Sequence, residues 1–367
     1  MINESKNNII IPFLGLTNGG GVRVLCELAN GLSNIGFNVV LLTTPISSFP
    51  FSINENVIII SRSKSKRENK ITTSIKDFLF IYKKSASYGD IFISNYYTTF
   101  YIGFFLNLFT KKLHIYFIQG YEPDFFDIKK SYINIIKSLI ARISYNIKPN
   151  LRITISQFIK NKIGKKDIVI INDGVELKTF NPNYVKNEND FKKTICSIAL
   201  SIKRKGFQDF VKAIQILESK RSDFRILLFS SERHTKFDLS FPHTIIYPND
   251  DKEIVKCLQE SDIFISSSHL EGFGLPGLEA MACGSVLITT NSGGVSEYAI
   301  NEFNSLIVNI GDVDALVIAI EKLLDQPSLM QKLRSNGIET SKLFSWEIMC
   351  EKFKLEIIKL QKEVCRK

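Results

Sequence analysis

Residues 263–290 hold the feature that most constrains the fold, two short apolar runs on either side of a glycine-rich segment. Residues 263–266 and 285–290 are typical of buried β-strands, because each is a brief apolar run bounded by small or polar residues. Between them we predict a loop and then a helix starting near Pro276, since proline lacks an N–H that the first turn would leave without a partner. Gly284 suits the end of that helix. The segment therefore predicts one parallel β–α–β unit.

The loop of this unit follows the carboxyl end of a strand, where open α/β sheets bind ligands. Its N–H groups at residues 272–275, with the amino end of the helix, favour an anion. Two carboxylates flank the loop with seven residues between them, Glu271 in the loop and Glu279 in the predicted first helical turn. Carboxylates accept hydrogen bonds from hydroxyl groups. A nucleotide sugar fits this pattern; alternatively, Glu279 only caps the helix dipole and Glu271 is solvated.

Composition sets broader limits. A length of 367 residues favours two domains, and the net charge of +10 favours an anionic partner in general, whether a nucleotide diphosphate, an anionic lipid surface or nucleic acid. Nucleic acid is the least supported, because no aromatic residues interleaved with Lys or Arg form an evident stacking platform. The six cysteines have no metal-binding spacing and lie mostly in apolar segments, which indicates buried, reduced thiols and a reducing compartment.

The amino-terminal half begins with a second β–α–β pattern. Residues 8–13 and 36–43 are predicted strands, and residues 22–35 have helical periodicity. The loop between the first strand and the helix contains Gly19 and Gly20, which would let a ligand approach the backbone closely. A dinucleotide-binding fingerprint does not follow, since no G-x-G-x-x-G stands in register with a later acidic residue.

Residues 112–118 predict another strand, followed by the polar segment 119–124. Polar clusters on such loops are typical of binding sites, so Gln119 is a candidate site residue. Residues 168–175 predict a strand that ends in a turn at Asn172, and the chain is expected to pass into its second domain near Asn183.

In the carboxyl-terminal half, residues 194–200 predict a strand and residues 207–217 a helix with one buried face. Between them stand Lys203, Arg204, Lys205 and Gly206. Such a basic triplet is either ordinary surface or, beside the predicted anion site, a clamp on a phosphate leaving group. We assign no Asp-x-Asp as a metal-ligand pair, and cations with a helix end could take the place of a metal ion.

Membrane contact is an open alternative at two places. The basic run 61–70 is either a solvated loop or a contact to anionic lipid. Residues 91–109 come nearest to a transmembrane length, but polar residues interrupt them, so a strand and a helix are expected there rather than a membrane-touching surface. The amino terminus lacks the order of a signal peptide.

The segment 268–284 resembles the Glu-x7-Glu motif of the retaining glycosyltransferases of family 4, group 1, and the resemblance continues through residues 291–312. It implies an α/β fold of the GT-B type, two Rossmann-like parallel-sheet domains facing a cleft. Residues 1–183 would bind the acceptor and residues 184–344 the nucleotide sugar. Residues 345–367 would form a helix that crosses back onto the first domain.

The resemblance also implies residue roles. Glu279 would bind the ribose hydroxyls, while Glu271 and the loop after it would bind the transferred sugar. Gln119 stands where many relatives carry a histidine, and because glutamine takes up no proton at neutral pH, a general base there is in doubt. Leu200 stands where the family has an arginine, for which Lys203 or Arg204 could substitute. The predicted catalytic residues are Glu271, Lys205 and Gln119; the predicted donor-binding residues are Glu279, Gly272, Phe273, Gly274, Leu275, Pro276, Arg204, Gly206, Gly19, Gly20 and Asn172; no metal or cofactor is expected.

The predicted function is metal-independent transfer of a hexosyl-type sugar, with retention, from a nucleotide-diphosphate donor to a glycan or lipid-linked saccharide. Many such relatives serve bacterial surface polysaccharide assembly, O-antigen or capsule, in the cytoplasm or peripherally at the inner face of the membrane. The alternatives are a GT-B nucleotide-sugar epimerase and, less supported, a basic nucleic-acid-binding protein. The donor base and sugar, the acceptor and the oligomeric state stay open.

Overall fold

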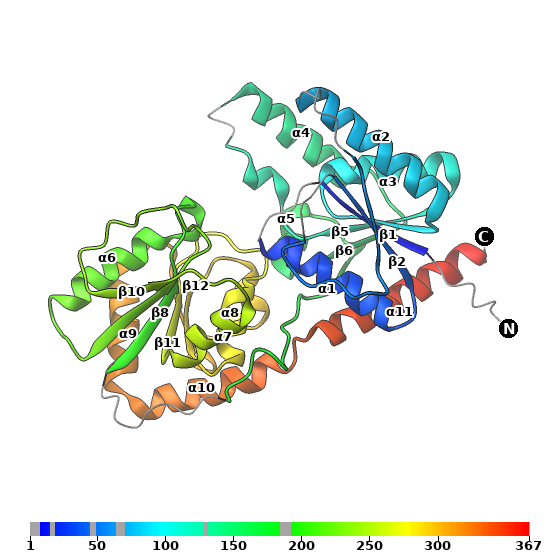
Figure 1. The fold of residues 1–367 in the computed structure, drawn as a ribbon. Coiled ribbons are helices and arrows are strands. Elements are labelled where there is room, and N and C mark those ends of the chain that lie inside the picture. Colours follow the sequence, from blue (N-terminus) through cyan, green and yellow to red (C-terminus); the bar gives the residue numbers. More distant parts are fainter. Residues whose placement is uncertain are drawn as a thin grey trace. The chain divides into compact units, whose positions relative to one another are not determined.

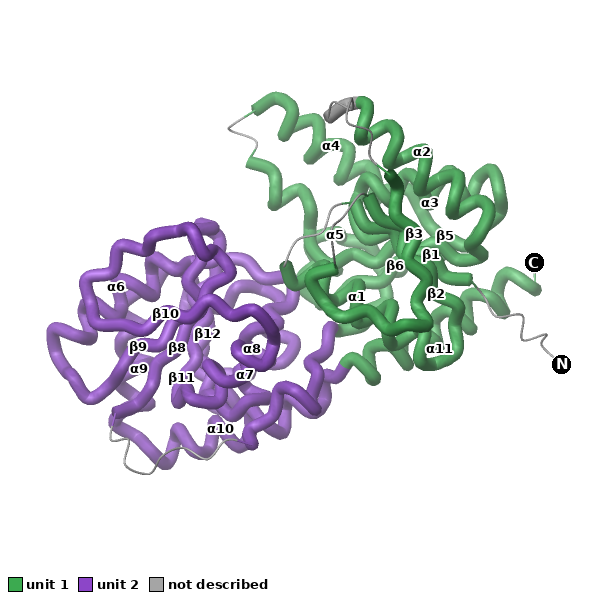
Figure 2. The backbone as a smooth tube through the Cα atoms, viewed as in Figure 1, with its two compact units in different colours: residues 1–172, 346–367 green, residues 173–345 purple. Residues whose placement is uncertain are grey.

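The computed structural model describes residues 8–14, 19–44, 49–63, 70–127, 131–183 and 192–366 (Figure 1). The chain forms two compact units, Met1–Asn172 with Trp346–Lys367, and Asp173–Ser345 (Figure 2). Each unit is a parallel β-sheet covered by helices, so the predicted pair of Rossmann-like domains is confirmed. In the part of the chain that is described, no helix is long and apolar enough to cross a membrane.

The sheet of the first unit has the strand order β3-β2-β1-β4-β5-β6-β7, and all its neighbours pair in parallel. Its strands are β1 (Asn8–Phe13), β2 (Asn38–Thr43), β3 (Ile58–Ser61), β4 (Ile91–Ser94), β5 (Leu113–Ile118), β6 (Leu151–Thr154) and β7 (Ile168–Ile170). Its helices are α1 (Gly20–Asn34), α2 (Lys70–Tyr88), α3 (Tyr97–Thr110), α4 (Tyr132–Asn146) and α5 (Gln157–Ile163). Helices α2, α3 and α4 lie side by side on one face of the sheet, and α1 lies on the other (Figure 1).

The last helix of the chain, α11 (Trp346–Cys365), packs against α1 of the first unit. Its buried face presents Phe353 edge-on to Phe117 of β5, with the ring centroids 5.0 Å apart. Cys350 lies so close to Gly31 of α1 that a Cβ there would be 2.2 Å from its Sγ. The predicted return of the carboxyl-terminal helix to the first unit is therefore confirmed.

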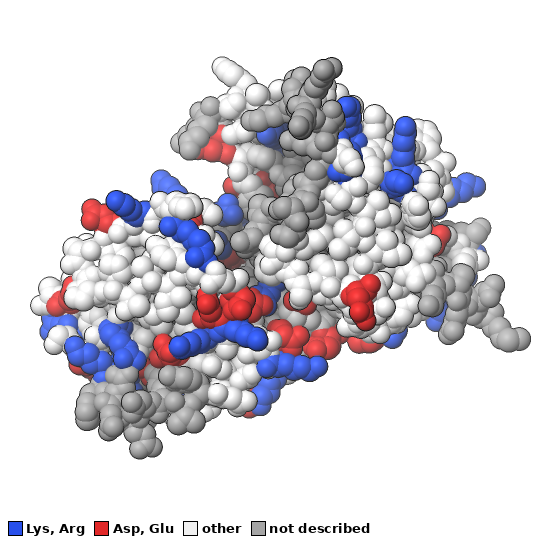
Figure 3. Space-filling view, viewed as in Figure 1, with Lys and Arg blue, Asp and Glu red and all other residues white. Residues whose placement is uncertain are grey.

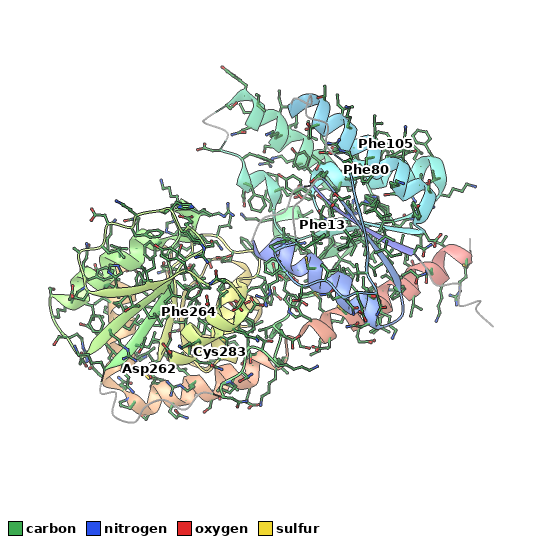
Figure 4. All side chains as sticks on the ribbon, in the orientation of Figure 1. Phe13, Phe80, Phe105, Asp262, Phe264 and Cys283 are labelled. Carbon is green, nitrogen blue, oxygen red and sulfur yellow. The ribbon has the colours of Figure 1, made fainter. Side chains whose placement is uncertain are left out.

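The sheet of the second unit has the order β10-β9-β8-β11-β12-β13, again parallel throughout. Its strands are β8 (Lys193–Ile198), β9 (Phe224–Phe229), β10 (His243–Ile246), β11 (Ile263–Ser266), β12 (Val286–Thr290) and β13 (Ser305–Val308). Its helices are α6 (Phe207–Glu218), α7 (Asp251–Glu260), α8 (Leu275–Ala282), α9 (Val313–Asp325) and α10 (Pro327–Ser341). Phe264 of β11 and Cys283 after α8 are both buried inside this unit (Figure 4).

The structure differs from the sequence prediction at several elements. Strand β3 and the long helices α2 and α4 were not predicted, although each is a complete element. Helix α1 begins at Gly20, because Gly19 takes the extended N-cap conformation, whereas a loop was predicted through Gly21. The predicted strand and helix within 91–109 are confirmed as β4 and α3. Most of the basic run 61–70 lies outside the described residues.

Candidate functional site

The candidate site lies where the strand order of the second sheet reverses. The chain runs from β8 outwards to β10 and then returns to place β11 on the other side of β8. Loops at the carboxyl ends of two such strands diverge and leave space for a ligand. The loop after β8 contains a short 3-10 helix, Lys203–Lys205, and the loop after β11 leads into α8. The glycine-rich loop predicted from the sequence therefore occupies the switch point of the sheet.

Several contacts join these two loops. The Oγ of Ser267 donates to the carbonyl of Gly206 at 2.9 Å, and the N–H of His269 donates to the carbonyl of Arg204 at 2.8 Å. The imidazole Nε2 of His269 lies 2.6 Å from the Oδ2 of Asp209 in α6. These contacts fix the basic turn against the segment that carries Glu271.

Lys205 and Glu271 meet directly, with 2.7 Å between the ammonium Nζ and the carboxylate Oε1. The backbone of Glu271 is also held on both sides, because its N–H donates to Ser292 and its carbonyl accepts from the N–H of Gly294. The alternative of a solvated Glu271 is therefore wrong. The structure brings together two side chains that stand far apart in the sequence.

The loop after Glu271 presents N–H groups that have no partner among the described residues. Among the described residues, none accepts a hydrogen bond from the N–H of Gly272, Phe273, Gly274 or Leu275. Gly274 takes a left-handed conformation with φ of 91° and is the N-cap of α8, without a side-chain cap. A run of backbone donors at a helix amino end is suited to bind an anion.

Gly294 lies directly behind this loop. A Cβ on Gly294 would be 1.9 Å from the carbonyl oxygen of Gly272 and 2.6 Å from the nitrogen of Phe273. The Phe273 side chain is buried against Tyr298 and Phe344, so only its backbone is available to a ligand. The loop therefore has a backing of tightly packed backbone and aromatic rings.

Glu279 lies on α8, but it is the fifth residue of that helix, so its predicted position in the first turn is wrong. The helix dipole acts mainly within the first turn, and capping it therefore does not explain this carboxylate. Glu279 is 8% exposed. Burial raises the pKa of Tyr298, and the charges of Glu271 and Glu279 raise it further, which places both carboxylates near one tyrosine. The Tyr298 hydroxyl donates to the carbonyl of Gly274 at 2.6 Å.

The remaining predicted residues lie in the first unit. The Oε1 of Gln119 lies 2.8 Å from the position of a Cβ on Gly21, so the structure brings Gln119 to the start of α1, next to Gly19 and Gly20. The Nδ2 of Asn172 donates to the carbonyl of Ile155 at 2.9 Å and so ties the chain after β7 to the chain after β6.

Three residues beside the second-unit site were missed as contributors by the sequence analysis. They are His269, Asp209 and Tyr298. His269 stands next to the glycine-rich loop in the sequence, which was a usable signal. Its partner Asp209 lies on α6, and only the pairing of β8 with β11 reveals the contact.

A separate basic hollow of the same unit contains none of the predicted residues. It is lined by Arg233, His234, Thr235, Lys236, Phe237, His243, Ile245 and Tyr247.

The segment after Gln119 holds a buried acid, Glu122, which is 3% exposed. Its carboxylate oxygens each accept a hydrogen bond from the N–H of Tyr97 at 3.1 Å, and Oε1 also accepts from the Tyr116 hydroxyl at 3.4 Å. Glu122 therefore ties the loop after β5 to the start of α3. Burial raises the pKa of Glu122 from 4.5 to about 8, despite these hydrogen bonds.

This shift predicts a pH dependence of stability. Between pH 4.5 and about 8 the folded chain keeps a proton on Glu122 that the unfolded chain has released. The stabilisation is therefore complete below pH 4.5 and is lost as the pH rises to the folded pKa. As the pH rises through that range, the free energy of unfolding of Glu122→Gln should increase relative to that of the native protein by at least about 1 kcal/mol. Urea unfolding at several pH values measures this difference, with Glu339→Gln at an exposed position as the control. Parallel curves of unfolding free energy against pH for all three proteins would contradict the prediction.

Comparisons with known proteins cover the unit that contains this site. Residues 183–340 match the family model described as glycosyl transferases group 1. The chain is 27% identical over 213 residues to the N,N'-diacetylbacillosaminyl-diphospho-undecaprenol alpha-1,3-N-acetylgalactosaminyltransferase of Campylobacter jejuni, covering 54% of this chain and 56% of that protein. It is 26% identical over 209 residues to the capsular polysaccharide biosynthesis glycosyltransferase CapM of Staphylococcus aureus, covering 50% and 55%. The chain thus spans about half the length of these curated relatives.

Solved structures match nearly the whole chain. The sucrose-phosphate synthase of Thermosynechococcus elongatus has a TM-score of 0.82 at 17% identity, over 97% of this chain and 100% of that one. HepE of Anabaena, solved in complex with UDP-glucose, has a TM-score of 0.74 at 13% identity, over 96% and 100%. Identities this low show the fold alone, which is GT-B. Within this GT-B chain, the second unit is therefore similar to the glycosyl transferases group 1 family.

Proposed function

We propose that the chain is a retaining, metal-independent glycosyltransferase that moves a hexosyl-type sugar from a nucleotide-diphosphate donor. The observation that carries this proposal is a group of charged and polar atoms at one switch point. It comprises one ammonium, two carboxylates and four backbone N–H groups that have no partner in the described part of the chain. The cationic part suits a diphosphate and the carboxylates suit hydroxyl groups. A nucleotide sugar combines both kinds of group.

The chemistry follows from where charge develops. When the bond between the sugar and the diphosphate breaks, negative charge grows on the leaving phosphate. Lys205 and the N–H groups of residues 272–275 are fixed donors that would stabilise this charge, which is usually the largest catalytic effect of such sites. A bound phosphate would also compete with Glu271 for Lys205 and release the Glu271 carboxylate to accept hydrogen bonds from the sugar. Glu279 would accept from the ribose hydroxyls.

No covalent nucleophile is proposed. The resemblance to retaining family members favours attack from the face that the leaving group departs, with the leaving phosphate as the base. Gln119 would then contribute hydrogen bonds rather than proton transfer, because an amide is neither acid nor base at neutral pH.

The acceptor is proposed from the relatives. The name of the Campylobacter relative includes a diphospho-undecaprenol-linked sugar, and that of the Staphylococcus relative includes capsular polysaccharide. We therefore propose a glycan or lipid-linked saccharide acceptor in bacterial surface polysaccharide assembly, at the cytoplasmic face of the membrane. The net charge of +10 is compatible with both the donor and an anionic surface.

A donor screen tests this proposal. The protein is incubated with UDP-, GDP- and dTDP-sugars, with and without a lipid-linked saccharide, and the released nucleotide and the products are measured. Nucleotide release from one donor class is expected, and conversion of the donor sugar without acceptor would instead favour an epimerase. Glu279→Ala should raise the donor KM about 10- to 100-fold, the usual cost of losing hydrogen bonds to a charged group. Glu339→Ala, at an exposed position of α10, is the control. An unchanged KM in Glu279→Ala would contradict the ribose role.

A further inference from the structure

The large apolar side chains of helix α4 point away from the sheet of its own unit. Its residues that face the unit are small or polar, namely Ser138, Ala141, Ser144 and Tyr145. Tyr132, Ile136, Leu139 and Ile143 are spaced as one helical face and point the opposite way. Tyr132 is 87% exposed, and the three aliphatic residues are between 43% and 57% exposed. Ile133 and Ile135 extend this outward row on either side.

The charged residues of α4 itself have one sign. Helix α4 contains no Asp or Glu, and its two charged residues, Lys137 and Arg142, are exposed at the edges of the row. The same layer continues through α3, where Phe105 is 37% exposed (Figure 4), to α2, where exposed Ile75 and Leu79 stand with Lys76 and Lys83. The only acid of α2, Asp77, is buried and paired with Arg62 at 2.5 Å.

Figure 3 shows Lys and Arg side chains gathered over the part of the first unit where Figure 1 places α2 and α3. The surface formed by α4 and its neighbours therefore combines outward apolar side chains with basic ones. A helix with Lys or Arg beside a broad apolar face is typical of helices that lie in the interface of a membrane.

We propose that α4 docks into the headgroup region of an anionic bilayer, with the row Tyr132, Ile136, Leu139 and Ile143 directed into the lipid. This proposal deepens the proposed function and rests on it for one point only, the source of the acceptor. A lipid-linked saccharide is presented at such a surface. Lys137 and Arg142 would contact the lipid phosphates. A second copy of the chain fits the row less well, because a symmetric contact would oppose the same basic residues and α4 offers no acid to pair with them.

Vesicle flotation tests the proposal with the full chain. The native protein should float with vesicles of phosphatidylglycerol and phosphatidylcholine at least about tenfold more strongly than with phosphatidylcholine alone, because two or more basic residues meet anionic lipid. The double variant Ile136→Asn/Leu139→Asn should lose at least about tenfold in partitioning, since several CH2 groups leave the contact. The control is Ile318→Asn/Leu355→Asn, which alters side chains of similar exposure on α9 and α11.

Three outcomes would overturn the proposal: equal flotation of the α4 variant and the native protein, equal loss in the control, or a lipid-free dimer that the α4 substitutions dissociate. Nucleotide release from the donor is measured on the same samples and should be unchanged in the α4 variant. If the native protein floats but releases no nucleotide from any donor, the proposed function is wrong and the lipid contact stands.

Discussion

Lys205→Met is expected to lower the turnover number about 10²- to 10³-fold, the usual effect of removing one fixed donor from a developing oxyanion. The substitution keeps an unbranched apolar side chain of nearly the same length and removes the ammonium that lies 2.7 Å from Glu271. The donor KM should also rise, because the same charge attracts the diphosphate before reaction. Steady-state rates of nucleotide release at several donor concentrations measure both effects.

Lys203→Met is the matched control, since Lys203 belongs to the same 3-10 helix but is exposed. Arg204→Met tests whether Arg204 supplies the positive charge that the resembling family carries at the position of Leu200. Similar losses in Lys203→Met and Lys205→Met would mean that the turn acts only through its overall charge. An active Lys205→Met enzyme beside an inactive Arg204→Met enzyme would transfer the phosphate role to Arg204.

Gly206→Ala should abolish most transfer and lower the free energy of unfolding by roughly 3 kcal/mol or more, a value that combines overpacking with backbone strain. The added Cβ would lie 1.8 Å from the carbonyl oxygen of Ser267, and the residue has φ of +64°, where side chains are strained. The nearest atom belongs to backbone, so the basic turn or the loop of β11 must move. That movement would separate Lys205 from Glu271.

Gly311→Ala separates the two causes. Gly311 lies in the same unit with a similar φ of +76°, but a Cβ there meets no atom within 4 Å. It should therefore show only the strain, about 1–2 kcal/mol, with normal donor turnover. Thermal and urea unfolding give the stabilities, and nucleotide release gives the activities. Equal destabilisation of the two variants would show that the contact with Ser267 is not limiting.

Much of the fold could be predicted because its causes are local. Strands of a buried parallel sheet are short apolar runs, and β1, β5, β11 and β12 are each such a run bounded by polar or small residues. Helix α8 was placed by Pro276 and Gly284, whose backbone preferences act within a few residues. The glycine-rich loop between β11 and α8 was therefore predictable in position and in kind.

The elements that were missed have a common reason. Helix α4 directs its aliphatic residues outward and its serines and alanine inward, so its periodicity does not identify a core-facing helix. Strand β3 is an edge strand with mostly exposed side chains, and it lacks the buried run that marks the other strands. In both elements the apolar side chains are largely exposed, so the local sequence pattern does not reflect burial in the hydrophobic core.

The sequence by itself determined the parallel α/β architecture, the loop 272–275 and the two carboxylates that flank it, because each depends on residues that are neighbours in the chain. Only the tertiary structure decided that Lys205 pairs with Glu271, that Asp209 holds His269 and that Gln119 lies beside Gly21. Those contacts depend on which strands are adjacent, such as β8 with β11. Strand order is set by the packing of the whole unit, and no local run of residues specifies it.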